Sequence, residues 1–572
     1  MSIKLPKINF ILWLFFIFSF AVFFWYSPVL FKGYPAAQID SEGNITAARN
    51  YASHQIFGSE SDLNVVVAPS LIKSDVVETL LGNKLTIFSY STLFRVLGPM
   101  DWSKIILIVI IIHALALVFF NITIFYLFGF KESIIFSFVY VLLPINWQTV
   151  YFVGTYEFAI LFFSIFTVLF FCFRSYKYRW PFLISSGLFL ALSGLSREAM
   201  FLSFPVIFLW LWFNKKRKDI LLIFIPLVLV LAIFWLPNFL KGDNEYLKLF
   251  VSSSDDNKKQ HSDLQYYGHL YPDPYTYYFN NKSILNSLQE TINNNNSGWF
   301  YRIDMLKSGA NMGIRSVNII ERFLVGTANF SRQISKFLSL EDIGGPFIFI
   351  LMLLGLYQLK HKNREIYFLF ISLMIVIPFL LSYVVLGRRS HLMDFSWIIA
   401  SLVSLGLISL YPLLKNYYQI TKHLKFLYGF IVILVFYSLI LANHVYFGNA
   451  YDSTKYTEIR YLANQVNISS PIINDNDVIA VSERGMHPSL NYLTNKSVVF
   501  FQPNTIYKLI EKGELQKAFD TFNVKYIIGY SSDLSDLIIK NSKVINISNW
   551  PEKSDIQAPL SYNKGWLLNL IK

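Results

Sequence analysis

Two carboxylates, Asp40 and Glu42, stand close together shortly after the first long apolar run of the chain. A carboxylate at a membrane surface can take a proton from an acceptor hydroxyl or hold a divalent cation. A structural interpretation is equally open. In it, Asp40 caps the helix-like segment that follows, and Glu42 interacts favourably with the dipole of that helix.

A third carboxylate, Glu157, opens another apolar run directly after the turn-like segment 153–156. An ionisable residue this close to hydrocarbon needs an explanation. One interpretation is an interfacial carboxylate that reaches back to water. The other is a second acidic wall of the same site as Asp40.

Arginines interrupt the apolar pattern at two further places. Arg197 stands between two apolar runs, and Arg388 and Arg389 stand just before a late run, followed by His391. A guanidinium keeps its charge and offers fork-shaped donors that match phosphate oxygens, so these residues are candidates for binding a lipid-linked phosphate or pyrophosphate. Structural alternatives are an ion pair of Arg197 with Glu198, and binding of anionic headgroups by the later arginines. His391 is alternatively an interfacial histidine.

The elements that must position these residues are membrane-spanning helices. Hydrophobic residues make up 54% of the 572 residues and charged residues only 15%, with a mean hydropathy of +0.44, which is too apolar for an ordinary soluble protein. A helix needs roughly 17 to 25 apolar residues to cross the hydrocarbon core. Runs of about this length predict a polytopic α-helical membrane protein with about eleven spans, at residues 9–31, 104–128, 133–152, 157–173, 181–196, 198–213, 219–240, 346–359, 366–386, 393–414 and 426–446.

Basic residues predict the orientation of these spans. With a cytoplasmic N-terminus, the short outside loops hold only Arg197, Arg388 and Arg389. The inside loops then hold a long series: Lys131, Arg174, Lys177, Arg179, Lys215, Lys216, Arg217, Lys218, Lys360, Lys362, Arg364, Lys415, Lys422 and Lys425. This bias favours a multi-pass protein of the cell membrane with its N-terminus in the cytoplasm. It also explains much of the net charge of +13 without nucleic acid as a partner.

The large polar segments then fall together outside the cytoplasm, as the loops 32–103 and 241–345 and the tail 447–572. The tail has short runs rich in β-branched and aromatic residues, separated by helix-like and turn segments, at 477–481, 497–501 and 524–530. These runs predict a small α/β domain. The chain is thereby divided into a membrane domain, 1–446, and a soluble extracytoplasmic domain, 447–572.

Several other kinds of chemistry lack support in the sequence. It contains no Walker-type glycine-rich loop, no Cys/His cluster with metal-ligand spacing and no nucleophile elbow. Cys172 is the single cysteine, so no intrachain disulfide forms. Energy from a bound nucleotide is therefore not expected.

The order of these motifs resembles that of the C-type membrane glycosyltransferases, over residues 8 to about 446. The segment Asp40-Ser41-Glu42-Gly43, with Ala48 and Tyr51 behind it, looks like the acidic motif that follows the first helix of that superfamily. The segment from Leu142 to Glu157 is similar to its second outside loop. Gly194 to Pro205 resembles its short loop with a basic residue, and Arg388 to His391 resembles a basic motif that opens a late helix.

This resemblance implies transfer of one hexose or pentose from a polyprenyl-phosphate donor to an extracytoplasmic protein, lipid or glycan of the cell envelope, by direct displacement with inversion. Asp40 is then the general base or a metal-coordinating carboxylate, and Glu42 and Glu157 assist. Arg197, Arg388, Arg389 and His391 bind the donor phosphate. The acidic motif is Asp-Ser-Glu, not the adjacent Asp-Glu of the protein-mannosyl and aminoarabinose-transferring branches, and the Trp-Trp-Asp signature of oligosaccharyltransferases is missing.

Two alternatives stay open. A polymerase or ligase of lipid-linked glycans also pairs outside arginines with a large outer loop and has less need of Asp40. A transporter of lipid-linked glycans predicts charges at mid-depth in the spans. The near absence of charge within the spans favours an enzyme over a transporter.

Overall fold

The computed structural model of the protein describes its helices and strands and the turns between some of them. The described residues are 8–32, 45, 48–49, 51–52, 84–98, 100, 102–151, 153–154, 156–173, 178–240, 330, 334, 336–382, 395–417, 421–450, 478–481, 497–500, 503–521, 524–529, 532–549 and 566–570. The chain divides into two units. The first comprises Met1–Gly33, Met100–Ser252 and Val317–Tyr451, and the second comprises Tyr34–Pro99, Ser253–Ser316 and Asp452–Lys572.

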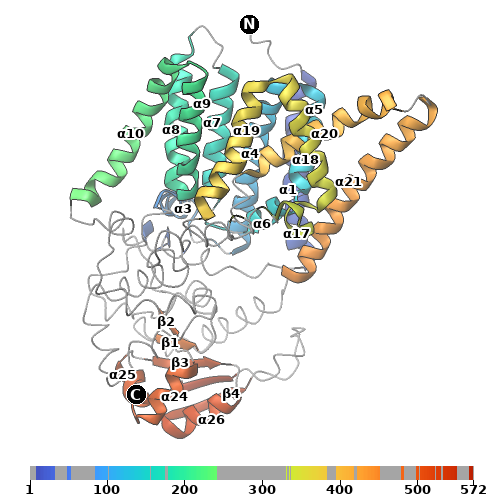
Figure 1. Cartoon of the computed structure of the whole chain (residues 1–572). Coiled ribbons are helices and arrows are strands. Elements are labelled where there is room, and N and C mark those ends of the chain that lie inside the picture. Colours follow the sequence, from blue (N-terminus) through green and yellow to red (C-terminus); the bar gives the residue numbers. More distant parts are fainter. Residues whose placement is uncertain are drawn as a thin grey trace. The chain divides into compact units, whose positions relative to one another are not determined.

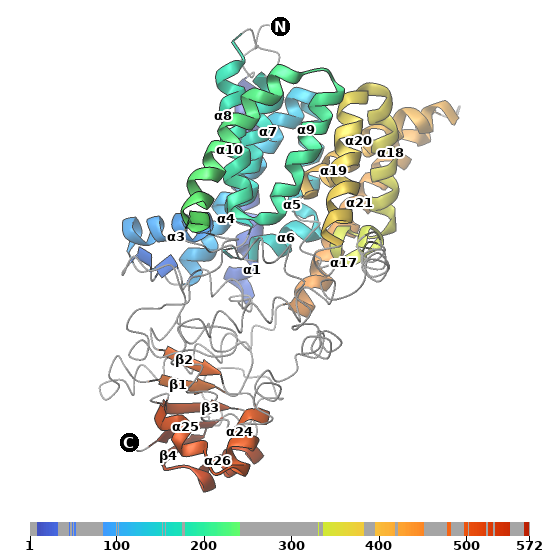
Figure 2. The same cartoon turned by 60° about the vertical axis from the view of Figure 1, so that its left-hand side comes forward.

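The first unit is a bundle of apolar helices (Figures 1 and 2). Its described elements are α1 (Ile8–Lys32), α4 (Trp102–Phe128), α5 (Phe130–Leu142), α6 (Pro144–Tyr151), α7 (Glu157–Phe173), α8 (Trp180–Ser196), η2 (Glu198–Leu202), α9 (Ser203–Phe213), α10 (Arg217–Leu240), η5 (Lys336–Leu338), α17 (Leu340–Ile343), α18 (Pro346–Lys362), α19 (Arg364–Ser382), α20 (Ser396–Tyr417) and α21 (Thr421–Ala450). Every predicted span therefore coincides with at least one helix.

Four of these helices are long and apolar enough to cross a membrane along their described length: Asn9–Leu30, Ser103–Phe128, Ser396–Lys415 and Leu424–Asn443. A fifth span results if α5 and α6 together make one. The protein thus has a largely helical fold with four to five candidate spans, and the larger number of eleven stays a prediction.

The predicted continuous span 133–152 is wrong in one respect, because α5 and α6 meet at an angle of 57°. Pro144 cannot donate a backbone hydrogen bond, and it disfavours helical backbone at the residue before it. Leu143 is accordingly extended, with φ −65° and ψ 123°. The Asn146 side chain donates to the carbonyl of Tyr140 at 2.6 Å and so satisfies an acceptor next to the break.

Close packing of α18 on α20 depends on two glycines. A Cβ atom added to Gly355 of α18 would lie 1.8 Å from the carbonyl oxygen of Leu402, and one added to Gly406 of α20 would lie 2.0 Å from that of Leu351. Small residues at such crossings allow helix backbones to approach each other in a membrane, where packing replaces the hydrophobic effect as the source of association.

The helices turn at two ends of the first unit. At the end where α1 begins, Phe10 stacks on Phe125 near the end of α4, with ring centroids 4.0 Å apart. The connections from α4 to α5, α7 to α8, α9 to α10, α18 to α19 and α20 to α21 lie at this end (Figure 1). We call it the basic end, because Lys and Arg gather there. The other is called the Glu157 end, after the residue that opens α7.

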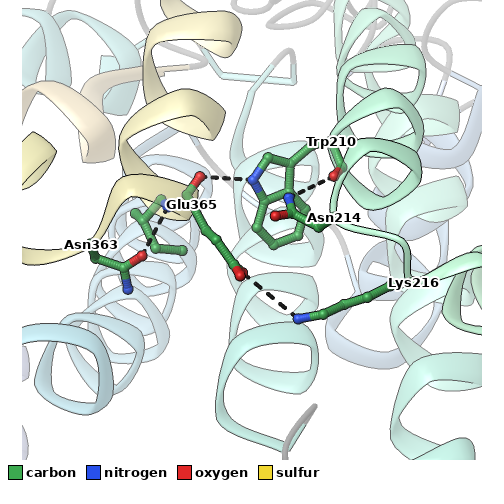
Figure 3. A network of polar contacts seen from close by, with 6 residues as sticks. Trp210, Asn214, Lys216, Asn363 and Glu365 are labelled. Carbon is green, nitrogen blue, oxygen red and sulfur yellow. Dashed lines mark hydrogen bonds and ion pairs between the residues drawn. The ribbon is translucent and has the colours of Figure 1, made fainter.

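Polar contacts link neighbouring helices at the basic end. The indole nitrogen of Trp210 donates to the backbone carbonyl of Glu365 at 2.8 Å, and the side chains of Lys216 and Glu365 lie 3.7 Å apart, which joins α9 and the start of α10 to α19 (Figure 3). The Asn363 side chain caps the start of α19 by accepting from the backbone N–H of Ile366 at 3.1 Å. The Asn363 contact satisfies a backbone N–H that the start of a helix otherwise leaves without a partner.

Two further ion pairs lie at the same end. Arg179 contacts the buried carboxylate of Asp219 at 2.9 Å, and Lys362 contacts Glu132 at 3.2 Å. Each joins segments that are distant in sequence or separated by a helix.

The described part of the second unit contains α3 (Lys84–Leu97) and an α/β sheet with its helices. The strands are β1 (Val478–Val481), β2 (Ser497–Phe500), β3 (Val524–Gly529), β4 (Val544–Asn549) and β5 (Trp566–Leu570), in the order β2-β1-β3-β5-β4. β1 is parallel to both β2 and β3, whereas β5 is antiparallel to both β3 and β4.

The helices α24 (Pro503–Glu511), α25 (Leu515–Thr521) and α26 (Ser532–Asn541) bury apolar residues such as Leu509, Phe519 and Ile538. The three predicted strand runs of the tail are confirmed as β1, β2 and β3, while β4 and β5 were not predicted from the sequence.

Candidate active site

Glu157 is fully buried at the start of α7, and its carboxylate closes the turn before that helix. One oxygen accepts the backbone N–H of Gly154 at 2.7 Å, and the other accepts that of Tyr156 at 3.0 Å. Gly154 has a φ of +77°, which glycine adopts at little cost. The turn thus depends on both residues. The interpretation of Glu157 as an interfacial side chain that reaches water is wrong, because backbone donors take the place of water.

Arg197 lies beside this turn. It is the extended residue between α8 and η2, with φ −154° and ψ 116°, and the central carbon of its guanidinium lies 3.8 Å from the ring centroid of Tyr156. This is a close cation–π contact. Glu157 and Arg197, predicted separately from two loops, are therefore brought together through Tyr156.

The backbone around Arg197 is held tightly. Its N–H donates to the carbonyl of Ser193 at 3.0 Å, and the Ser193 hydroxyl donates to the carbonyl of Ala159 in α7 at 2.9 Å. Gly194 faces the ring of Phe201, and a Cβ atom there would lie 2.4 Å from the ring. A larger residue at this position would require the ring or the turn from α8 into η2 to shift.

The ends of two more helices lie at the Glu157 end. Near the end of α1, the indole of Trp25 donates to the carbonyl of Val141 at 3.1 Å, and the hydroxyl of Tyr151 donates to the carbonyl of Trp25 at 2.5 Å. At the start of α20, the side chain of Ser396 is hydrogen-bonded to Tyr140, near the end of α5. The chain thus leaves α1 and enters α20 at the end where Glu157 and Arg197 stand.

The remaining predicted site residues lie outside the described residues. Asp40 and Glu42 follow α1 in the sequence, and Arg388, Arg389 and His391 precede α20. Their roles stay predictions. The described residues just behind the acidic pair have helical backbone, in agreement with the helix-like segment expected there: Ile45, Ala48, Arg49, Tyr51 and Ala52.

His113, which the sequence did not single out as a site residue, lies well inside α4 and is 2% exposed. Its ring contacts that of Trp25 edge to face, with centroids 6.4 Å apart. Its Nε2 atom has no hydrogen-bond partner in the described part of the chain. A lone ionisable residue in the middle of an apolar run was the signal that could have found it.

The described residues contain no group of three or more His, Cys, Asp or Glu side chains placed to hold a metal ion. Asp40 and Glu42 lie outside the described residues. Carboxylates of this kind suit the hard divalent cations that prefer oxygen ligands.

Comparison with known proteins rests on structure, because no protein-family model and no curated protein matches the chain. One similar structure is that of the oligosaccharyltransferase AglB from the archaeon Archaeoglobus fulgidus, solved in complex with an inhibitory peptide and a dolichol-phosphate. The superposition covers 90% of this chain and 69% of the AglB chain, at a TM-score of 0.53 and 10% sequence identity. ArnT from Cupriavidus metallidurans was solved bound to undecaprenyl phosphate. Its superposition covers 97% of this chain and 97% of the ArnT chain, at a TM-score of 0.50 and 9% sequence identity.

The chain therefore has a fold similar to that of AglB and ArnT, and at these identities the likeness concerns the fold alone. The resemblance inferred from four short motifs is thereby confirmed for the architecture, whereas the donor, the acceptor and the role of each residue stay predictions.

Proposed function

We propose that this chain is a membrane glycosyltransferase that moves one sugar from a polyprenyl-phosphate donor to an acceptor outside the cytoplasm. The observation that carries the proposal is the fold shared with ArnT, which holds undecaprenyl phosphate and is matched over 97% of both chains. The AglB structure, which holds a dolichol-phosphate and a peptide, gives the same association between this fold and a lipid phosphate.

In the proposed reaction, an acceptor hydroxyl oxygen forms a bond to the anomeric carbon of the sugar, while the bond from that carbon to the phosphate oxygen breaks. Asp40 takes the hydroxyl proton as general base, or holds a divalent cation that polarises the reacting groups, and Glu42 assists it. The bonding electrons leave with the polyprenyl phosphate. Attack from the opposite face inverts the anomeric carbon.

Arg197, Arg388 and Arg389, with His391, neutralise the negative charge that grows on the departing phosphate. Charge stabilisation of this kind can supply a large part of a rate enhancement. The contact of Arg197 with Tyr156 supports this role for one of the four. An aromatic ring holds a guanidinium by its flat face, and the N–H donors of the group lie in its own plane, where phosphate oxygens are met.

For Glu157 we propose a positioning role. Both of its oxygens accept backbone N–H groups of the turn that carries Tyr156. A carboxylate used in this way fixes the ring on which Arg197 rests. Glu157 then assists transfer by holding Arg197 in place, and a test must separate loss of this geometry from loss of a proton acceptor.

The proposal includes the topology predicted from the sequence. About eleven spans with a cytoplasmic N-terminus place the Glu157 end, the loops 32–103 and 241–345 and the domain 447–572 outside the cytoplasm. Addition of cysteine-reactive probes from either side to single-cysteine variants at Lys218 and Ser382 checks this orientation, with Cys172 replaced by serine.

The decisive experiment measures transfer of labelled sugar from polyprenyl-phosphate donors by membranes that contain the wild-type chain or Asp40→Asn. The substitution keeps the size of the side chain but removes the base and the anionic ligand. We expect transfer to fall by roughly 100-fold or more. Asp536→Asn is the matched control, because Asp536 is an exposed residue of α26, and its transfer should equal that of the wild type.

Unchanged transfer by a stably inserted Asp40→Asn variant would remove Asp40 from the chemistry and favour the ligase or polymerase alternative, which rests on the arginines. Lipid-linked glycan that crosses the membrane without covalent transfer would favour a transporter. The described helices argue against the latter, because His113 is the one residue among their Asp, Glu, Lys, Arg and His side chains that lies near the middle of a long apolar helix.

A further inference from the structure

A pocket of about 550 Å³ opens at the basic end of the first unit, away from Glu157 and Arg197. Residues of three helices line it: Lys131, Ile134 and Ile135 from α5, Ile408 and Tyr411 from α20, and Lys425 and Tyr428 from α21. The polar groups of the pocket are two lysines and two tyrosines, and its remaining wall is isoleucine. No step of the proposed transfer uses it.

The charge of this pocket is positive. Lys131 and Lys425 are both exposed, and neither has an acidic partner in the described part of the chain. Lys131 lies in the first turn of α5, which follows Gly129 and has no side-chain cap. The N-terminus of a helix adds a partial positive charge and backbone donors to those of the lysine.

Neighbouring charges do not cancel this potential. Glu132 is next to Lys131 in the sequence, but its carboxylate contacts Lys362 at 3.2 Å and does not line the pocket. Lys415, in the last turn of α20, adds a further positive charge near the turn into α21. The surroundings therefore favour an anion.

The apolar side of the same region suits a lipid. Ile134 and Ile135 of α5 and Ile408 of α20 form the apolar wall of the pocket itself. The rings of Tyr411 and Tyr428, which also line the pocket, pack edge to face with centroids 5.4 Å apart. Tyrosine and snorkelling lysine at a helix end are typical of the level of lipid headgroups.

We propose that this pocket binds an anionic phospholipid, with the phosphodiester between Lys131 and Lys425 and the acyl chains against the isoleucine wall of the pocket. Basic pockets between membrane helices bind lipid headgroups in this way. The inference is independent of the proposed function, because it concerns the opposite end of the bundle and assigns the lipid no part in transfer. A bound lipid would fill the angle between α20 and α21 and stabilise their packing.

The test counts lipid molecules retained by the full-length protein in native mass spectra, after incubation with phosphatidylglycerol or with phosphatidylcholine. The wild type should retain phosphatidylglycerol in clear preference. Lys131→Gln/Lys425→Gln should reduce phosphatidylglycerol binding by roughly 30-fold and leave phosphatidylcholine binding unchanged, because each lysine near a headgroup contributes about a fivefold factor.

Lys218→Gln/Lys360→Gln is the matched control, since both residues are exposed lysines at the basic end and neither lines the pocket. Its lipid binding should equal that of the wild type. Lys131→Arg/Lys425→Arg should restore binding, which separates loss of charge from loss of fold.

The proposal would be overturned if Lys218→Gln/Lys360→Gln lost as much phosphatidylglycerol binding as Lys131→Gln/Lys425→Gln. It would also be overturned if Lys131→Gln/Lys425→Gln bound phosphatidylglycerol as well as the wild type. A separate competition experiment uses undecaprenyl phosphate. If it displaces phosphatidylglycerol from the wild type at a much lower concentration, and the pocket pair removes this preference, the occupant is a lipid phosphomonoester and the assignment to a phospholipid is wrong.

Discussion

At the basic end of the helical unit, buried carboxylates meet cationic side chains, whereas at the Glu157 end the buried carboxylate meets backbone N–H groups and the cation lies on an aromatic ring. Asp219 and Arg179 are 2.9 Å apart, and Glu132 and Lys362 are 3.2 Å apart. Glu157 instead accepts from Gly154 and Tyr156, and Arg197 stacks on Tyr156. The first arrangement joins helices by opposite charge. The second fixes the turn before α7 and holds the guanidinium of Arg197 on the ring of Tyr156.

This difference separates stability from function in a way that substitutions can test. If the basic end only joins helices, changes there should lower the free energy of unfolding and leave the activity of each folded molecule intact. Changes at the Glu157 end should lower activity by more than any loss of stability explains.

The largest effect is expected from Arg197→Ala. Loss of the guanidinium removes a positive charge from the proposed phosphate site, and sugar transfer should fall by about 100-fold or more. Arg197→Lys should retain part of the activity, because the charge remains but the planar fork and the stacking on Tyr156 are lost.

Lys218→Ala, at an exposed position of the basic end, is the comparison for Arg197→Ala and should keep transfer within about twofold. The two variants are compared by their initial rates of transfer, divided by the amount of folded protein that size-exclusion chromatography measures. Equal rates for Arg197→Ala and the wild type would remove Arg197 from the site.

Gly194→Ala should act on the same site through the backbone. Its Cβ atom would lie 2.4 Å from the ring of Phe201, so either this ring or the turn that carries Arg197 must shift. We expect a loss of about 1–3 kcal/mol in stability and a roughly tenfold loss in transfer, because displacement of a positioning group by about 1 Å is costly.

Gly429→Ala is the control for this change, because nothing lies within 4 Å of the Cβ atom that it adds to α21. Alanine is the better helix former, so this variant should be as stable as the wild type or slightly more stable. Thermal unfolding in detergent compares the two. A Gly194→Ala protein with wild-type stability and transfer would show that Phe201 moves aside at no cost.

Asp219→Asn should instead lower the free energy of unfolding and leave transfer per folded molecule unchanged. Asp219 is 1% exposed, but its partner Arg179 is about half exposed, so solvent weakens the ion pair and the expected loss is about 1–2 kcal/mol. Glu365→Gln, in the 3.7 Å contact with Lys216, should cost no more than about 0.5 kcal/mol, because the side chains of Lys216 and Glu365 are 33% and 51% exposed and solvent weakens their attraction. Transfer per folded molecule should match the wild type in both. A tenfold loss of transfer in either variant would break the division between the two ends.

The positions of the helices could be predicted from the sequence because hydrocarbon admits only backbone with its own hydrogen bonds, so a long apolar run is a helix. The strands β4 and β5 could not. β4 reads Val-Ile-Asn-Ile-Ser-Asn, in which three of the six residues are polar, and β5 pairs antiparallel between β3 and β4, partners that lie far apart along the chain. Such pairing depends on tertiary contacts more than on local preference.

The candidate site shows the same limit. Residue type and the order of spans predicted that Glu157 and Arg197 would share one face of the membrane. They did not predict that Glu157 would bind its own turn, since that depends on the positive φ of Gly154 and on burial of the carboxylate. Nor did they predict Tyr156 beneath Arg197, because loop conformation places the ring.

A small effect is expected at His113, which belongs to neither end. Its buried Nε2 atom lacks a hydrogen-bond partner in the described residues, and an unsatisfied buried polar atom costs free energy. His113→Leu should therefore raise the stability by about 1 kcal/mol and leave transfer unchanged. His113→Gln, which keeps a polar group in the apolar surroundings, should show no such gain. Thermal unfolding and transfer assays compare the stability and activity of the wild type, His113→Leu and His113→Gln. If His113→Leu instead abolishes transfer without loss of stability, the function of the bundle extends to mid-depth, and the division of labour between its two ends is incomplete.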